Sequence, residues 1–265
     1  MSDDAVLLDI EDGIATITLN KPDMRNALTR DISAGLVDAI DEVEESDEAR
    51  CVVVQGSGGG FSAGGDVNSM MERMSGEVDL HDAVESIVRK TSEAIKAVYQ
   101  TTLPTVAKID GPAFGAGANL AVACDVLLAT EDARISFGFR QVGLTMDTGT
   151  SYFLPRIVGE NIAKELVYTG ELVEADRAAD LGLFNHVYAE DEFEEQADDL
   201  IDDIASGPTV ALSNSKRLLR QGLQSSLDQA IHNEAAAQGA VFETDDHEEG
   251  ATAFMEGRKP DFQGE

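Results

Sequence analysis

The feature that most constrains the fold is a succession of strand, glycine-rich loop and helix that occurs twice. Residues 50–55 and 105–109 are continuous apolar runs, the pattern of parallel strands that are covered on both faces. A glycine-rich stretch follows each run, at residues 61–66 and 111–117, and a helix can begin after each stretch. In open α/β sheets the ligand crevice lies at the carboxyl ends of the strands. The sequence therefore predicts an α/β fold in which both glycine loops border one site.

Other segments extend this pattern. Alternating β-branched runs at 6–10 and 14–19, joined by Glu-Asp-Gly, predict a hairpin. Thr29 is the expected cap of a helix that ends near residue 46. Helical spacing or apolar runs further predict helices at 79–100 and 118–123 and strands at 126–129 and 183–187. The rest of the chain after residue 152 is helical in pattern, notably at 210–219, 227–242 and 251–254.

The length of 265 residues suits one large core with a smaller appendage. Pro208 follows Ser-Gly near the point where the last helical segments begin, which is typical of a boundary. We therefore expect two units: an α/β core over residues 1–198 and a helical region over residues 199–265.

The cellular compartment is inferred from three features. The first residues, Met-Ser-Asp-Asp, lack the basic and apolar regions of a signal peptide. The long uncharged stretch 111–130 contains Pro112 and Asp125, so a buried helix followed by a strand fits it better than a membrane span. Cys51 and Cys124 lie in apolar runs, which predicts buried reduced thiols. These features favour a cytoplasmic protein.

Net charge is the most unusual bulk property of the chain. There are 51 acidic residues against 19 Lys and Arg, a formal net charge of −32, and the acids are spread along the whole sequence. Such a surface repels itself in dilute buffer, whereas molar salt shortens the Debye length to about 3 Å. We expect a protein adapted to a salt-rich cytoplasm, with an ordinary acidic protein as the alternative. Nucleic-acid binding, which needs a basic surface, is disfavoured.

The two glycine loops also suggest chemistry. Each loop can aim unpaired backbone N–H groups at one point, because helix N-termini leave such groups free. Two facing donors would form an oxyanion hole, and Asp147 would supply proton transfer beside it. The alternatives are that the loops are only tight turns and that Asp147 caps the helix that follows it. No pair among the four histidines has ligand spacing, so we predict no metal site.

Several segments, taken in order, resemble the crotonase superfamily of enoyl-CoA hydratases and isomerases. They are Phe-Ser-Ala-Gly-Gly-Asp from residue 61, Gly-Pro-Ala-Phe-Gly-Ala-Gly from 111, Gly-Leu-Thr-Met-Asp from 143, Leu-Asn-Lys-Pro-Asp-Met-Arg-Asn-Ala-Leu from 19 and Phe-Met-Glu-Gly-Arg-Lys-Pro-Asp-Phe from 254. The resemblance implies a core spiral of ββα turns and a C-terminal helical region that assembles a homotrimer or a dimer of trimers. It also implies acyl-CoA thioester substrates and no permanently bound cofactor.

Carried over by position, the resemblance assigns the oxyanion donors to the backbone N–H groups of Gly65 and Ala116. It implies CoA contacts through two sets of residues. The first comprises Lys21, Arg25, Ala63 and Asp66, where Asp66 is also the expected cap of the next helix. The second is Lys259, which would reach the nucleotide end of CoA in a neighbouring subunit together with Arg258.

The chain departs from the hydratase pattern at both of its acid–base positions. Asn119 and Gln141 stand where hydratases of the family carry glutamates, and amides do not titrate in the working pH range. Asp147 resembles the proton-shuttling Asp of related isomerases, with Met146 in place of a Pro. Dehalogenation is disfavoured, because the His that it requires would fall near Ser92.

We therefore expect an isomerase of unsaturated or ring-bearing acyl-CoA in which Asp147 moves the proton and Asn119 and Gln141 shape the pocket. A hydratase with a rearranged site and a non-catalytic acyl-CoA-binding protein are the alternatives.

Overall fold

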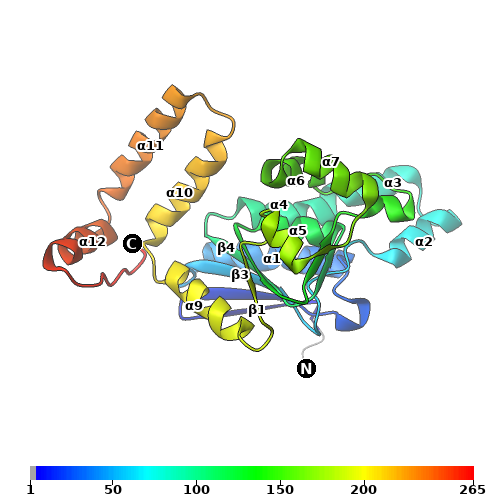
Figure 1. Ribbon diagram of the computed structural model, residues 1–265, viewed down its shortest axis with the longest axis horizontal. Helices are drawn as coiled ribbons and strands as arrows, with labels where there is room; N and C mark the ends of the chain where they lie inside the picture. Colours follow the sequence, from blue (N-terminus) through cyan, green and yellow to red (C-terminus); the bar gives the residue numbers. More distant parts are fainter. Residues whose placement is uncertain (1–3) are drawn as a thin grey trace.

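A six-stranded sheet forms the centre of the computed structural model, which describes residues 4–265 (Figure 1). The strand order is β1-β2-β3-β4-β6-β9. β1 and β2 form the predicted antiparallel hairpin, and every later neighbour pairs in parallel. The strands are β1 (Val6–Glu11), β2 (Ile14–Leu19), β3 (Cys51–Gly56), β4 (Thr105–Ile109), β6 (Val126–Thr130) and β9 (His186–Tyr188). The predicted α/β class is confirmed.

A second, three-stranded sheet was not predicted from the sequence. It consists of β5 (Pro112–Phe114), β7 (Arg134–Ser136) and β8 (Val173–Glu174) in the order β5-β7-β8. These strands have only two or three residues, which is too short for an alternating pattern to be visible. The small sheet matters for the site because β5 lies within the second glycine-rich stretch, directly before Gly115 and Ala116.

Helices cover the sheet and continue beyond it. The α-helices are α1 (Arg30–Glu45), α2 (Val67–Ser75), α3 (Leu80–Ser86), α4 (Ser92–Gln100), α5 (Ala116–Ala123), α6 (Thr150–Val158), α7 (Glu160–Thr169), α8 (Ala175–Asp180), α9 (Phe193–Ala205), α10 (Thr209–Gly222), α11 (Leu227–Val241) and α12 (Asp245–Glu256). Three short helical segments are η1 (Pro22–Met24), η2 (Ile87–Thr91) and η3 (Phe139–Val142).

Buried strand residues divide between the two faces of the central sheet. Val52 and Val54 of β3 join the main core on the side of α1, α4 and α5, whereas Cys51 and Val53 face α9. This alternation on a strand that is apolar throughout confirms the prediction of cover on both faces. Thr29 caps α1 as expected, since its hydroxyl accepts from the Ile32 N–H at 3.3 Å.

The segment predicted as one helix over 79–100 has three parts. α3 and α4 are joined by η2, a π-helical turn, so the axis continues while the hydrogen-bond pattern changes. α2 precedes them and begins directly after Asp66, where the sequence predicts that a helix can start. Both cysteines are free and buried, as the sequence predicts.

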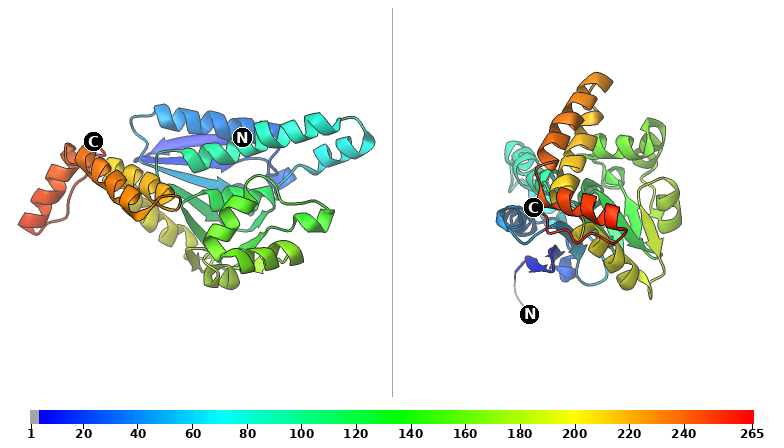
Figure 2. Two further views of the ribbon diagram at one scale, coloured as in Figure 1. Left: turned by 90° about the horizontal axis from the view of Figure 1, so that it is seen from above. Right: turned by 90° about the vertical axis from the view of Figure 1, so that its left-hand side faces the viewer.

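The C-terminal helices project from the core as an extended arm (Figures 1 and 2). Asp125, which directly precedes β6, anchors α10: it pairs with Lys216 at 2.7 Å and with Arg220 at 2.9 Å. Lys216 is 8% exposed and also donates to the Leu103 carbonyl. The boundary expected after residue 198 falls inside α9, which is a single helix packed on the sheet. Within residues 4–265 no helix has both the length and the apolar character needed to cross a membrane.

Candidate active site

The two glycine loops meet at the carboxyl ends of β3 and β4. Isolated bridges join Leu28 to Gly65 and Ser62 to Ala113. A Cβ added at Gly117 would lie 2.6 Å from the Ser62 carbonyl oxygen, closer than real Cβ contacts occur. Glycine at this position therefore allows the first turn of α5 to approach the first loop.

The expected oxyanion donors lie in these facing turns. Gly64 has φ +88°, and a Cβ there would lie 2.3 Å from the Phe114 carbonyl oxygen and 3.2 Å from the Ala116 nitrogen. Gly65 is the next residue in the first loop. Ala116 is the first residue of α5, where the backbone N–H has no partner within the helix. The structure thus brings the loops of Gly65 and Ala116 together.

Asn26 supports the first loop, although sequence reasoning gave it no role. It is fully buried at φ +52°. Its Nδ2 donates to the carbonyls of Ser57 and Gly60, both at 2.9 Å, and its Oδ1 accepts from the Lys21 N–H at 3.0 Å. The distinctive local feature of Asn26 is its positive φ. A sequence does not show φ, so sequence reasoning had no signal for this residue.

Asp147 lies in a tight turn before α6. The carboxyl is half-buried, and burial raises its pKa, while a hydrogen bond from the Thr148 hydroxyl at 3.2 Å opposes that rise. The turn has an unusual backbone, with Thr148 at φ +45° and Gly149 at φ +103°. Gly149, not Asp147, is the N-cap residue of α6, so the alternative of a helix-capping Asp147 does not apply.

Asn119 connects α5 to this turn. It is fully buried, and its Nδ2 donates to the Asp147 carbonyl at 3.0 Å and to Thr148 Oγ1 at 2.7 Å. Its Oδ1 accepts from Thr150 Oγ1 at 2.9 Å. Asn119 lies one turn after Ala116 on α5, so Asp147 is held beside that helix. Both amide hydrogens of Asn119 are used in these contacts.

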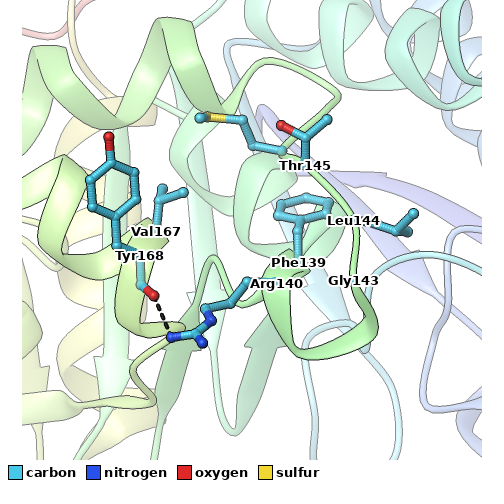
Figure 3. Close-up of a pocket in the computed structure, with 8 residues that line it drawn as sticks. Phe139, Arg140, Gly143, Leu144, Thr145, Val167 and Tyr168 are labelled. Atoms are coloured by element: carbon cyan, nitrogen blue, oxygen red, sulfur yellow. Dashed lines mark hydrogen bonds between the residues drawn. The ribbon is translucent and has the colours of Figure 1, made fainter.

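Gln141 points elsewhere. Its Nε2 donates to the Gly170 carbonyl at 2.8 Å, and it does not line the nearby pocket. That pocket has a volume of about 570 Å³ and is formed by the loop after η3 and by α7 (Figure 3). Its lining residues are Phe139, Arg140, Gly143, Leu144, Thr145, Met146, Val167 and Tyr168.

The pocket adjoins both halves of the site. Met146 directly precedes Asp147, and the Phe139 ring lies 3.8 Å from the Cβ that Gly115 lacks. Phe139, Leu144 and Met146, which are close to Asp147 in the sequence, supply apolar walls of this pocket. Phe153, also close in the sequence, does not line it and packs against Tyr99, with ring centroids 5.1 Å apart.

The residues expected to contact CoA divide into two groups. Arg25 and Ala63 are adjacent, since the Ala63 N–H donates to the Arg25 carbonyl at 2.8 Å, and Lys21 lies in the same turn region. Asp66 caps α2 by accepting from the Asn68 N–H at 2.9 Å. Lys259 follows α12, at the end of the molecule opposite α2 (Figure 1), so one chain does not bring it to the other four.

One group on α3 has the geometry of a cation site. Ligand atoms of His81, Asp82 and Glu85 lie within 4.8 Å of one another. All three are on the surface, and Glu85 pairs with Arg89 at 2.8 Å. The group lies on the surface helix α3, and its acids need no ion to be stable in water.

A family model described as enoyl-CoA hydratase/isomerase matches residues 9–265. The chain therefore belongs to the enoyl-CoA hydratase/isomerase family, the crotonase superfamily, as the sequence motifs indicated. Its predicted fold, the spiral α/β core with a C-terminal helical region, and its predicted enzyme class are both confirmed.

Relatives carry out more than one reaction. The chain is 33% identical to the crotonyl-CoA hydratase of Syntrophomonas wolfei over 265 residues, covering 99% of each protein. It is 29% identical to the 1,2-epoxyphenylacetyl-CoA isomerase of Escherichia coli over 259 residues, covering 98% of each. The crystal structure of an enoyl-CoA hydratase from Bacillus anthracis superposes with a TM-score of 0.92 at 28% identity, covering 98% of this chain and 100% of that one. Family membership therefore leaves the specific reaction open.

Proposed function

We propose that this enzyme isomerises an unsaturated or ring-bearing acyl-CoA through a thioester enolate. The observation that carries the proposal is the contrast between positions 119, 141 and 147. Asn119 and Gln141 are non-titrating amides whose hydrogen bonds go to the protein, whereas Asp147 is a half-buried carboxyl whose pKa is raised by burial. Asp147 is therefore the one of these three groups that can exchange a proton with the substrate.

In the proposed reaction the backbone N–H groups of Gly65 and Ala116 bind the thioester oxygen. The Asp147 carboxylate removes a proton from the carbon next to the thioester, and the electron pair moves onto that oxygen as an enolate. The carboxylic acid then returns the proton at the far end of the conjugated system, so the product has the same composition as the substrate. One oxyanion donor lowers the barrier by about 3–4 kcal/mol.

We assign the rest of the substrate to neighbouring surfaces. The apolar pocket between η3 and α7 is proposed to hold the acyl group beyond the reacting carbons, because it adjoins both Asp147 and the turn before Ala116. Lys21, Arg25, Ala63 and Asp66 are proposed to contact CoA. Lys259 would do so from a neighbouring copy in a homotrimer or dimer of trimers. A cytoplasmic location remains a prediction.

The test compares two substrates at molar salt. We expect the enzyme to convert a 3-enoyl-CoA to its conjugated isomer, which is monitored by the rise in ultraviolet absorbance. We expect no addition of water to a 2-enoyl-CoA. Asp147→Asn is expected to lower turnover at least about a hundredfold with little change in KM, because the proton carrier is lost and the binding surface is kept. Asp132→Asn, at an exposed position, is the matched control.

Two outcomes would replace this proposal. Efficient hydration of the 2-enoyl-CoA would make the enzyme a hydratase with a rearranged site. Tight CoA binding with neither activity, unaffected by Asp147→Asn, would indicate an acyl-CoA-binding protein.

A further inference from the structure

The turn that carries Asp147 contains a hydrogen-bond chain whose direction is fixed by chemistry. A carbonyl oxygen can only accept, so the Asn119 atom 3.0 Å from the Asp147 carbonyl is Nδ2. The same Nδ2 donates to Thr148 Oγ1 at 2.7 Å. The Thr148 hydroxyl has one hydrogen, and this hydrogen is left for Asp147 Oδ1, 3.2 Å away. We call this hydrogen-bond chain from Asn119 through Thr148 to Asp147 the relay.

We propose that Asn119 and Thr148 are positioning residues that reserve Oδ2 of Asp147 for the proton carried between substrate carbons. The hydrogen bond from Thr148 occupies one lone pair of Oδ1 and makes it the less basic oxygen of the carboxylate, so the proton goes preferentially to Oδ2. Within residues 4–265, Oδ2 has no hydrogen-bond partner. This inference deepens the proposed function and rests on it.

The same contacts hold a strained backbone. Thr148 is β-branched at φ +45°, a conformation that such residues rarely adopt. Asn119 grips the turn on both sides of this residue, at the Asp147 carbonyl and at the Thr150 hydroxyl. A glutamate at position 119 could not donate to the Asp147 carbonyl when ionised. The amide therefore serves the turn in a way that a carboxylate could not.

The surroundings of Asp147 leave Thr148 as the main polar influence on its carboxyl. Burial raises the pKa of Asp147, and the Thr148 hydrogen bond lowers it. α5 contains no titratable side chain. Of the nearby cations, Arg140 donates to the Tyr168 carbonyl and Arg156 lies over the Tyr152 ring at 3.6 Å. Neither forms an ion pair with Asp147 in the described part of the chain.

The main test replaces the hydroxyl but keeps the shape. Thr148→Val removes the donor with the same branching, and Thr148→Ser keeps the donor. Asp147 must be ionised to accept the proton, so turnover falls below its pKa. Loss of the donor destabilises the carboxylate, so the acid limb of the turnover–pH profile should move to higher pH in Thr148→Val. Thr148→Ser should keep the wild-type limb. Superimposable profiles for all three proteins would overturn the proposal.

Asn119→Leu tests the other half of the relay. Loss of the hydrogen bonds from Asn119 to the turn should lower turnover about a hundredfold at every pH, because misplacing a catalytic group by about 1 Å costs that much. If Asn119→Leu has wild-type turnover and an unmoved acid limb, the hydrogen bonds of Asn119 do not position Asp147.

A measurement that needs no activity separates the relay from the reaction. Carbon-13 NMR of protein labelled at the aspartate carboxyls, with the Asp147 signal identified by its loss in Asp147→Asn, follows the titration directly. A higher midpoint in Thr148→Val than in Thr148→Ser supports the relay, and equal midpoints refute it. If Asp147→Asn remains active, the proposed function fails, while this titration still decides whether the relay exists.

Discussion

At the scale of single residues, Asp147 shows a conflict between stability and catalysis. Burial raises its pKa, so the folded protein binds this proton more tightly than the unfolded chain does. The free energy of unfolding therefore falls as pH rises from the unfolded pKa, near 3.9, through the folded pKa, and stays lower above it. The carboxylate needed for proton transfer destabilises the native state.

Asp147→Asn removes this titration and is expected to be more stable than the wild type at pH 7. The difference should shrink as pH falls through the folded pKa of Asp147, since both proteins are then uncharged at this position. Thermal unfolding from about pH 4.5 to 8 at constant salt measures it, with Asp132→Asn as the exposed control. A variant that is less stable than the wild type throughout this range would contradict the argument.

Residue identities indicated part of the site. Gly65, Ala116 and Asp147 could be assigned because family motifs specify backbone donors and one acid. The roles of Asn26, Asn119 and Thr148 could not be predicted, because they depend on which hydrogen bonds form across 28 or more residues of chain, as between Asn119 and Asp147. The sequence predicted Asn119 and Gln141 as pocket residues, and in the structure their amide groups are occupied by backbone carbonyls.

At the scale of elements, the position of α5 depends on contact between two loops without a side chain between them. Gly117→Ala would place a Cβ 2.6 Å from the Ser62 carbonyl oxygen and 2.7 Å from the Ser62 Cβ. We expect the loops to separate, which should lower turnover about a hundredfold and stability by about 1–3 kcal/mol. Steady-state kinetics and urea unfolding of the purified variant measure both effects.

Gly239 is the matched control for this prediction. It lies in α11, and a Cβ there would meet nothing within 4 Å. Gly239→Ala should leave turnover unchanged and stabilise the helix by up to about 1 kcal/mol. If Gly117→Ala behaves like Gly239→Ala, close loop contact is not what places Ala116.

Element prediction succeeded where the pattern is long. The hairpin, α1 and the buried strands β3 and β4 were predicted close to their observed bounds. The three strands of the small sheet and the π turn within 79–100 were missed. Their pairing is set by tertiary contacts, such as the bridge between Ser62 and Ala113, and local periodicity does not encode those contacts.

At the scale of the whole molecule, the net charge of −32 governs the response to salt. We expect the melting temperature to rise steadily between about 0.1 and 2 M KCl, because the Debye length falls from about 10 Å to below about 3 Å and repulsion among acids is screened. Light scattering in the same buffers should show assembly into multiples of three copies of 28.2 kDa, about 85 kDa, only at high salt.

The proposed contact surface is the arm of α10 and α11. It exposes Leu219, Leu223, Leu227 and Ile231, each more than half exposed. Apolar groups of this size on an acidic surface favour association once charge repulsion is screened. A melting temperature independent of salt, with a single-copy mass at 2 M KCl, would count against both the salt adaptation and the assembly.

The anchor at Asp125 has a consequence for how this protein can be divided. The carboxylate accepts from the backbone N–H and the hydroxyl of Thr105 and pairs with two cations of α10. It therefore connects the first residue of β4 to the C-terminal helices. A chain cut after Gly207 would remove both counter-charges of Asp125 and the Lys216 ammonium that donates to the Leu103 carbonyl. The sheet edge at β4 and β6 and the C-terminal helices therefore depend on each other, and a shortened chain would need new partners for Asp125 and for the Leu103 carbonyl.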